Sequence, residues 1–139
     1  MDELAPLDRD GAINAIRERL MEPRTESTSP DGTLLFSGGS PPDVLIALSG
    51  STIHVAIYDP ETATTRPPAG DQTIVSLNWQ RLPAPHLVMS LNVALGSARE
   101  LRFATFQHCK RCDALTAPEL LNEHVICENC NNRDLGVVY

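Results

Sequence analysis

The N-terminal part of the chain has apolar residues at helical spacing. Three of them recur three and four positions apart: Ile13, Ile16 and Leu20. This pattern predicts one amphipathic helix over residues 8–22, with Asp8 or Asp10 as the N-cap and Pro23 just past the end. Because the helix has a single apolar stripe, we expect it to pack on a sheet.

Beyond residue 33 the pattern changes to alternation, which is typical of strands. Strands are expected over residues 33–36, 44–48, 52–58, 73–79, 86–95 and 100–107. Loops are expected over residues 23–32, 37–42 and 59–72, which are rich in Pro, Gly, Ser and Thr. The clearest hairpin joins the second and third strands through Ser49-Gly50-Ser51, with His54 on its exposed face. Strands that follow one another without helices favour an α+β fold, a helix on a mostly antiparallel sheet.

All four cysteines lie in the last third of the chain, in two C-x2-C motifs separated by 14 residues: Cys109, Cys112, Cys127 and Cys130. Two thiolates at this spacing can hold one metal ion from a single tight turn, a zinc knuckle. Two knuckles supply the four sulfurs of a closed tetrahedral Zn²⁺ site. The sequence therefore predicts one structural zinc ion.

The residues around the cysteines agree with this interpretation. Asp113 and Asn131 follow the second cysteine of each motif, where a left-handed backbone is often needed, and Asp and Asn tolerate it. Four basic residues are candidates to balance the charge of the thiolates: His108, Lys110, Arg111 and Arg133. Within the spacer, Thr116 and Glu119 have capping-box spacing, which predicts a helical turn at 120–121 and a returning strand at 124–126.

Other uses of the cysteines remain open. Structural disulfides, a thioredoxin-like redox motif and a rubredoxin-like iron site are alternatives to zinc, and sulfur ligands alone do not separate iron from zinc. His108 and His124 are not needed as ligands when four sulfurs are available. A closed shell of four sulfurs leaves no position for a reacting water, which argues against a catalytic metal.

The two knuckles resemble the zinc-ribbon class, in which cysteine knuckles cap β-hairpins around one zinc ion. The resemblance covers residues 103–139 and implies a metal and a local fold but no particular activity. The chain departs from the common ribbon pattern because no glycine follows either knuckle. We expect residues 1–102 to form an α+β domain and residues 103–139 to form the zinc-ribbon hairpin.

Composition limits the partners. The chain has 139 residues and a formal net charge of -7, so it lacks a general attraction for phosphate backbones or anionic membranes. No apolar run is long enough to span a membrane and the first residues are acidic, so we expect a cytoplasmic protein without a membrane partner.

No pattern typical of catalysis is present, and the only lysine is Lys110, so we expect no enzymatic activity. A protein-interaction or adaptor module with a structural zinc is the favoured function. The alternative is nucleic-acid binding through the ribbon. The candidate contacts for that alternative are Arg99, Arg102, Lys110 and Arg111.

Overall fold

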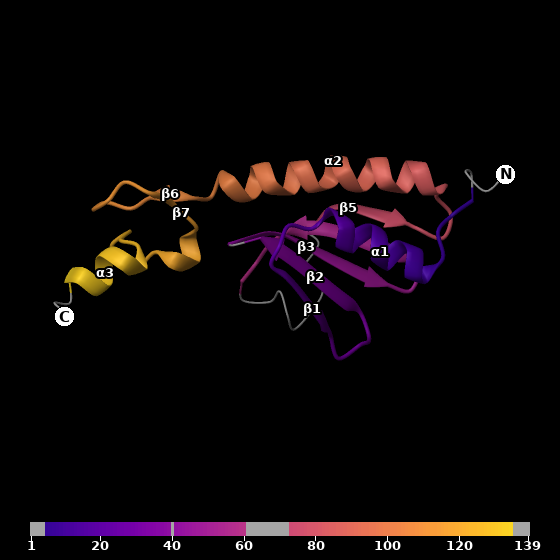
Figure 1. Ribbon diagram of the computed structural model, residues 1–139, viewed down its shortest axis with the longest axis horizontal. Helices are drawn as coiled ribbons and strands as arrows, with labels where there is room; N and C mark the ends of the chain where they lie inside the picture. The colour runs from indigo at the N-terminus through magenta and orange to yellow at the C-terminus, as the bar shows by residue number, and fades with distance from the viewer. Residues whose placement is uncertain (1–4, 40, 61–72, 135–139) are drawn as a thin grey trace. The chain divides into compact units, whose positions relative to one another are not determined.

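The computed structural model describes residues 5–39, 41–60 and 73–134 (Figure 1). The chain separates into two compact units, Met1–Arg102 and Phe103–Tyr139. No helix among the described residues is long and apolar enough to cross a lipid bilayer.

The predicted N-terminal helix is confirmed as α1, Arg9–Arg19. Asp8 is its N-cap, because the Asp8 side chain accepts a 2.7 Å hydrogen bond from the amide of Gly11. The helix is shorter than expected and stops when Leu20 adopts an extended backbone. Leu20 is nevertheless buried and continues the apolar stripe beyond the helix.

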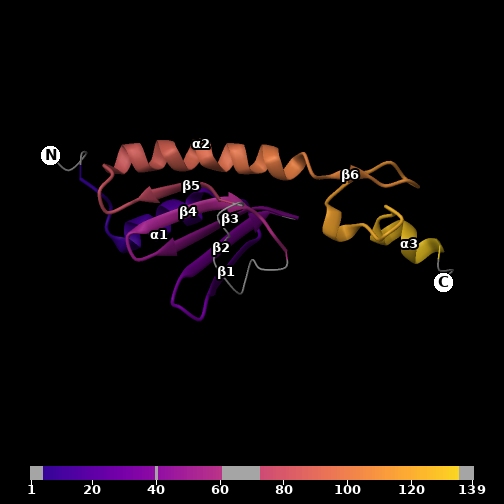
Figure 2. The ribbon, with the colours of Figure 1, turned by 180° about the vertical axis from the view of Figure 1, so that it is seen from behind.

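A five-stranded antiparallel sheet follows, with the strands in sequence order across it. The strands are β1 (Arg24–Thr28), β2 (Leu34–Gly39), β3 (Pro42–Ser49), β4 (Thr52–Ile57) and β5 (Thr73–Asn78). The expected hairpin is β3–β4, in which Ser49 pairs with Thr52 across the turn. The antiparallel arrangement, predicted because the strands follow one another without helices between them, is thus confirmed. Figure 2 shows the same sheet from behind.

Two expected loops are partly strand. Residues 23–32 contain β1, which alternation could not indicate because four of its five residues are exposed. Its structure comes from pairing with β2, where Arg24 lies opposite Gly38. Likewise β2 continues to Gly39 and β3 begins at Pro42, so the predicted break at 37–42 reduces to a tight connection. Gly39 has φ 102°, a conformation that glycine adopts without strain.

The two strands expected over 86–95 and 100–107 are wrong, because the chain forms one 20-residue helix there, α2 (Ala84–Phe103). Its buried residues recur at helical intervals: Leu87, Leu91, Ala94, Leu95, Ala98 and Arg102. The apolar run of residues 86–95 hides this period, since exposed positions such as Val93 are also apolar. In both views α2 runs alongside β5 (Figures 1 and 2).

One hydrophobic cluster fills unit 1 and draws on α1, α2 and one face of the sheet. Phe36, Ile16 and Leu91 are among its completely buried members. Trp79 is 4% exposed, and its indole Nε1 donates a 3.1 Å hydrogen bond to the backbone oxygen of Gly50. The opposite face of the sheet holds a smaller cluster around Leu45.

That smaller cluster alters one expectation about the hairpin. The face of the hairpin expected to be exposed also carries Ala56, which is completely buried opposite Leu45. His54 lies on the same face but is only half-buried, with Nδ1 2.8 Å from the hydroxyl oxygen of Ser76 on β5.

Unit 2 contains short elements. They are β6 (Gln107–His108), β7 (Leu115–Thr116), the 3-10 turn η2 (Pro118–Leu120) and α3 (Glu128–Asp134). The turn lies close to its predicted place, but Thr116 does not cap it, because its hydroxyl donates to the backbone oxygen of Ala114. The strand expected at 124–126 is absent. The amides of His124 and Ile126 there donate to the side-chain oxygen of Asn122 instead.

Candidate metal centre

The first knuckle lies in the β6–β7 hairpin. The amide of Cys109 donates to the backbone oxygen of Ala114 at 3.0 Å, and the amide of Asp113 donates to the backbone oxygen of Cys109 at 2.8 Å. Asp113 has φ 64°, as its position after the second cysteine predicts. The hairpin and this left-handed residue present Cys109 and Cys112 from one turn.

The second knuckle is built differently from the first. Cys127 forms an isolated bridge with Leu121, and Cys130 lies in the first turn of α3. The expected second hairpin is therefore wrong, and so is the left-handed backbone at Asn131, which is helical. The left-handed residue in this half is Val125, with φ 62°.

The four cysteines come together. All are free thiols, and their Sγ atoms lie within 4.8 Å of one another. The Sγ atoms of Cys112 and Cys127 are 3.8 Å apart. A tetrahedral metal about 2.3 Å from each sulfur places the sulfurs about 3.8 Å apart. The four cysteines are thus arranged to bind a metal ion, and the disulfide and thioredoxin-like interpretations of the motifs lose their main support.

Backbone amides prepare the buried sulfur of Cys109 for a metal. The amides of Arg111 and Cys127 each donate to this Sγ across 3.4 Å. Hydrogen bonds from the amides of Cys112, Cys127 and Arg111 hold the pKa of the Cys109 thiol at about 6, because they stabilise the thiolate. The knuckle therefore favours the thiolate form of Cys109, which is the form that binds a metal.

The pKa of the Cys130 thiol is shifted in the opposite direction from that of Cys109. Burial, together with the neighbouring thiols of Cys127 and Cys112, raises the pKa of the Cys130 thiol to about 12. Four thiolates so close together repel one another unless a cation lies between them. A divalent cation at this position removes that cost, which is the chemistry expected of a metal centre.

Among the described residues, neither His108 nor His124 belongs to the sulfur cluster. His108 is 62% exposed, and its Nδ1 lies 2.9 Å from the backbone oxygen of Asp113. His124 is 72% exposed and lies 3.5 Å from Glu123. Lys110 and Arg111 are exposed beside the first knuckle, and the side chain of Arg133 lies outside the described residues.

Two arginines of the nucleic-acid alternative, Arg99 and Arg102, make contacts within unit 1. Arg102 is only 4% exposed, and its Nε donates to the backbone oxygen of Pro42 at 3.2 Å. Its guanidinium carbon lies 5.4 Å from the centre of the Tyr58 ring. The Nε atom of Arg99 lies 3.3 Å from Asp43, a half-buried pair within unit 1. Arg102 belongs to α2 and not to the strand expected over residues 100–107.

Asn122 is a shaping residue that the sequence analysis missed. Its side-chain oxygen accepts the amides of His124 and Ile126, and its Nδ2 donates to the side-chain oxygen of Asn131 at 3.2 Å. These bonds set the path of the chain into Cys127. An Asn that opens a short polar stretch was the available signal, since Asn side chains often bond the backbone two residues later.

Comparison of the chain with protein-family models, with curated proteins and with solved structures found no match. The assignment of the metal centre therefore depends on the spacing of the cysteines and on the positions of their sulfurs.

Proposed function

We propose that this protein is a non-enzymatic binding protein whose C-terminal unit is organised by one structural Zn²⁺. The observation that carries the proposal is the set of four sulfurs within 4.8 Å of one another. Four protein sulfurs complete the tetrahedral shell of zinc and leave no position for water or substrate. The metal would thus stabilise the fold of unit 2 and would take no part in a reaction.

Zinc is preferred to iron as the metal. Iron in a four-sulfur site works by changing its charge, and such sites are usually shielded from water. Cys112 is exposed and Cys127 is half-buried, which suits a metal with no redox chemistry. Iron remains the alternative that metal analysis tests.

The character of unit 2 supports a protein partner. Residues 103–139 contain three basic and five acidic residues, which disfavours binding to phosphate backbones. Large apolar side chains are exposed on this unit: Phe103, Leu115 and Leu120 are 54%, 49% and 37% exposed. Exposed apolar residues on a metal-stabilised scaffold are typical of a protein-interaction module.

Elemental analysis of the freshly purified full chain tests the metal. We expect one zinc per chain, with loss of zinc from Cys109→Ser and Cys130→Ser and full zinc in the control His108→Ala. Full zinc in both serine variants, or iron in place of zinc, contradicts the proposed centre.

Three further experiments separate the candidate functions. A heparin column at low salt should not retain the protein, whereas retention that salt abolishes would favour the nucleic-acid alternative. A partner that copurifies with the wild type and is lost with Leu115→Asp would support the interaction module. Turnover by the purified protein of a substrate identified in an activity screen would contradict a non-enzymatic role.

A further inference from the structure

Strand β5 forms one edge of the sheet, and its side chains do nothing to protect that edge. It pairs with β4, and among the described residues no strand lies on its other side. Its sequence, Thr-Ile-Val-Ser-Leu-Asn, contains neither a charged residue nor a proline. Monomeric proteins usually protect an exposed edge with charges, prolines or a bulge. A bulge occurs here at residue 74, but 75–78 pair regularly with β4.

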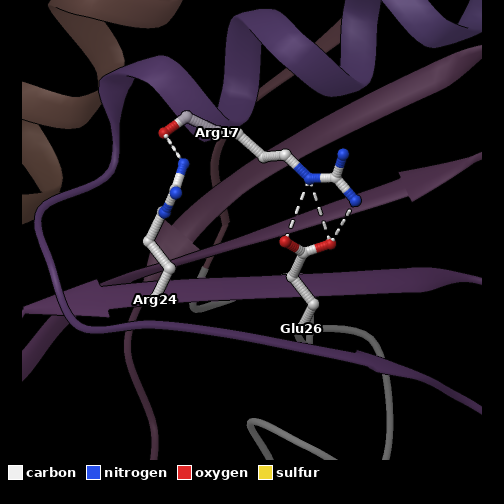
Figure 3. A network of polar contacts seen from close by, with 3 residues as sticks. All are labelled: Arg17, Arg24 and Glu26. Carbon is white, nitrogen blue, oxygen red and sulfur yellow. Dashed lines mark hydrogen bonds and ion pairs between the residues drawn. The ribbon is translucent and has the colours of Figure 1, made fainter.

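The opposite edge, β1, shows the usual protection. Glu26 on this strand accepts hydrogen bonds of 2.7 and 3.0 Å from the guanidinium group of Arg17 on α1 (Figure 3). Arg24 on the same strand donates to the backbone oxygen of Arg17 at 2.9 Å. The charged β1 edge is therefore poorly suited to pair with another chain, and the contrast makes β5 the edge that is suited to it.

An apolar groove of about 350 Å³ runs between β5 and α2. Its walls include Ile74, Val75 and Leu77 of β5 and Met89, Val93 and Ala94 of α2. Met89 is 65% exposed and Val93 is 71% exposed. No Asp, Glu, Lys or Arg occurs in residues 84–98, although the whole chain carries a net charge of -7. Because the face is uncharged, two acidic copies can meet on it without bringing their carboxylates together.

Gly96 lies on the same stripe of α2 as Met89 and Val93, since the three are separated by four and three residues. It is exposed, and a Cβ added to it would meet nothing within 4 Å. Glycine weakens the interior of a helix, and nothing in the packing of this chain requires it here. A neighbouring helix that approaches this face closely would require it.

The geometry points to a symmetric dimer in which β5 and the stripe of Met89, Val93 and Gly96 form the interface. In this dimer β5 pairs antiparallel with β5 of a second copy, and α2 lies antiparallel beside its equivalent. A two-fold axis near Val93 brings Met89 of each copy against Gly96 of the other, because these two residues are almost equally far from Val93. A protruding methionine and an open glycine on one stripe make the face complementary to itself.

The face formed by β5 and the α2 stripe is complementary to itself, and this favours a second copy of the chain over other binding partners. An unrelated extended peptide could use the edge of β5 and fill the groove, but it would have no need for Gly96. The second copy uses the strand edge, the groove and the glycine together. It also makes residue contacts reciprocal, as a two-fold interface demands.

Sedimentation equilibrium of the full-length metal-bound protein tests the dimer. We expect twice the monomer mass of 15.2 kDa at high concentration, with dissociation on dilution. Val93→Asp places two carboxylates near the axis and should raise the dissociation constant more than about 100-fold. The control Met21→Asp changes a side chain that is 57% exposed, and it should leave the dimer intact. The backbone of Met21 lies beside Gly38 of β2, and β3 and β4 separate β2 from β5 in the sheet.

Gly96→Leu is a second variant that tests the dimer even if Val93→Asp disturbs the fold of the monomer. Since a Cβ at this exposed position would meet nothing within 4 Å in the monomer, this variant should fold with undiminished thermal stability when dilute, yet its dimer should be weakened at least about 10-fold by the collision with Met89. A wild type that stays monomeric at the highest concentrations would overturn the proposal. So would a dimer that neither Val93→Asp nor Gly96→Leu weakens.

Discussion

The backbone amide of Cys127 donates a hydrogen bond across 3.4 Å to Sγ of Cys109, so the second knuckle is joined directly to a sulfur of the first. A second link runs in the opposite direction, from the amide of Lys110 in the first knuckle to the backbone oxygen of Val125 at 2.9 Å. The positions of the four sulfurs therefore depend on both knuckles together.

Removal of the metal should loosen unit 2 and leave unit 1 folded. The main core lies entirely within unit 1 and ends at Ala98, whereas the buried hydrophobic residues in the described part of unit 2 are Cys109, Ala117 and Cys130. Metal binding in isolated zinc fingers is worth about 10–16 kcal/mol, which exceeds what so small a unit supplies by itself. Hydrogen exchange with and without a strong chelator should show lost amide protection over residues 107–130 and unchanged protection in β3 and α2. Equal loss in both units would contradict this expectation.

Val125→Asn should tighten metal binding. A β-branched residue at φ 62° is strained, whereas Asn tolerates the left-handed region. Relief of this strain is expected to gain about 1 kcal/mol, or about fivefold in metal affinity. Competition with a chromophoric chelator measures the affinity.

Asp113→Val is the matched control for that variant. It places a β-branched residue at φ 64° in the first knuckle, so its metal affinity should fall by a similar factor. Equal affinity of both variants and the wild type would show that backbone strain has no influence on the centre.

Gly38→Ala should destabilise unit 1. A Cβ at this position would lie 2.5 Å from the backbone oxygen of Met21, which cannot move away as a flexible side chain can. We expect the free energy of unfolding to fall by about 2 kcal/mol. Gly96→Ala, measured on dilute protein, is the control and should raise it by up to about 1 kcal/mol. Urea denaturation compares the two, and equal midpoints would be inconsistent with the close contact at Gly38.

Acid should open the contact between α1 and β1. Hydrogen bonds from Arg17 hold the pKa of the Glu26 carboxyl below its usual value. Because the folded-state pKa is lower than the unfolded one, the contribution to stability is present at neutral pH and is lost as the pH falls through the lowered pKa. Carboxyl NMR titration should place Glu26 below its usual midpoint, and Arg17→Gln should return it upward. An identical midpoint in the two proteins would rule out the pairing in solution.

Several features could be predicted from the sequence because the local signal and the final structure agree. The spacing of Cys109, Cys112, Cys127 and Cys130 indicated a metal cluster, and their sulfurs do converge. Asp8 and the stripe through Ile16 indicated α1. Alternation around Ser49-Gly50-Ser51 indicated the β3–β4 hairpin, since one of its faces is buried in the core.

Other elements could not be predicted, each for a physical reason. Helix α2 has apolar residues on its exposed side as well as on its buried side, so the helical period is weak, and Met89 and Val93 are the residues that obscure it. Strand β1 is mostly exposed and has no alternation to detect. The second knuckle begins a helix, and the spacing of its two cysteines is the same as in the hairpin knuckle, so the spacing alone does not distinguish the two structures.

Trp79 is the single tryptophan of the chain, and it is sealed inside unit 1 with its indole bonded to Gly50. We therefore expect its fluorescence to change when unit 1 unfolds and to stay unchanged when the cysteines lose the metal. In protein loaded with Co²⁺ in place of Zn²⁺, titration with a chelator should abolish the cobalt-thiolate absorbance. The emission maximum of Trp79 should stay unchanged over the same titration. Tryptophan fluorescence and cobalt-thiolate absorbance can thus follow the folding of unit 1 and the metal-dependent ordering of unit 2 separately.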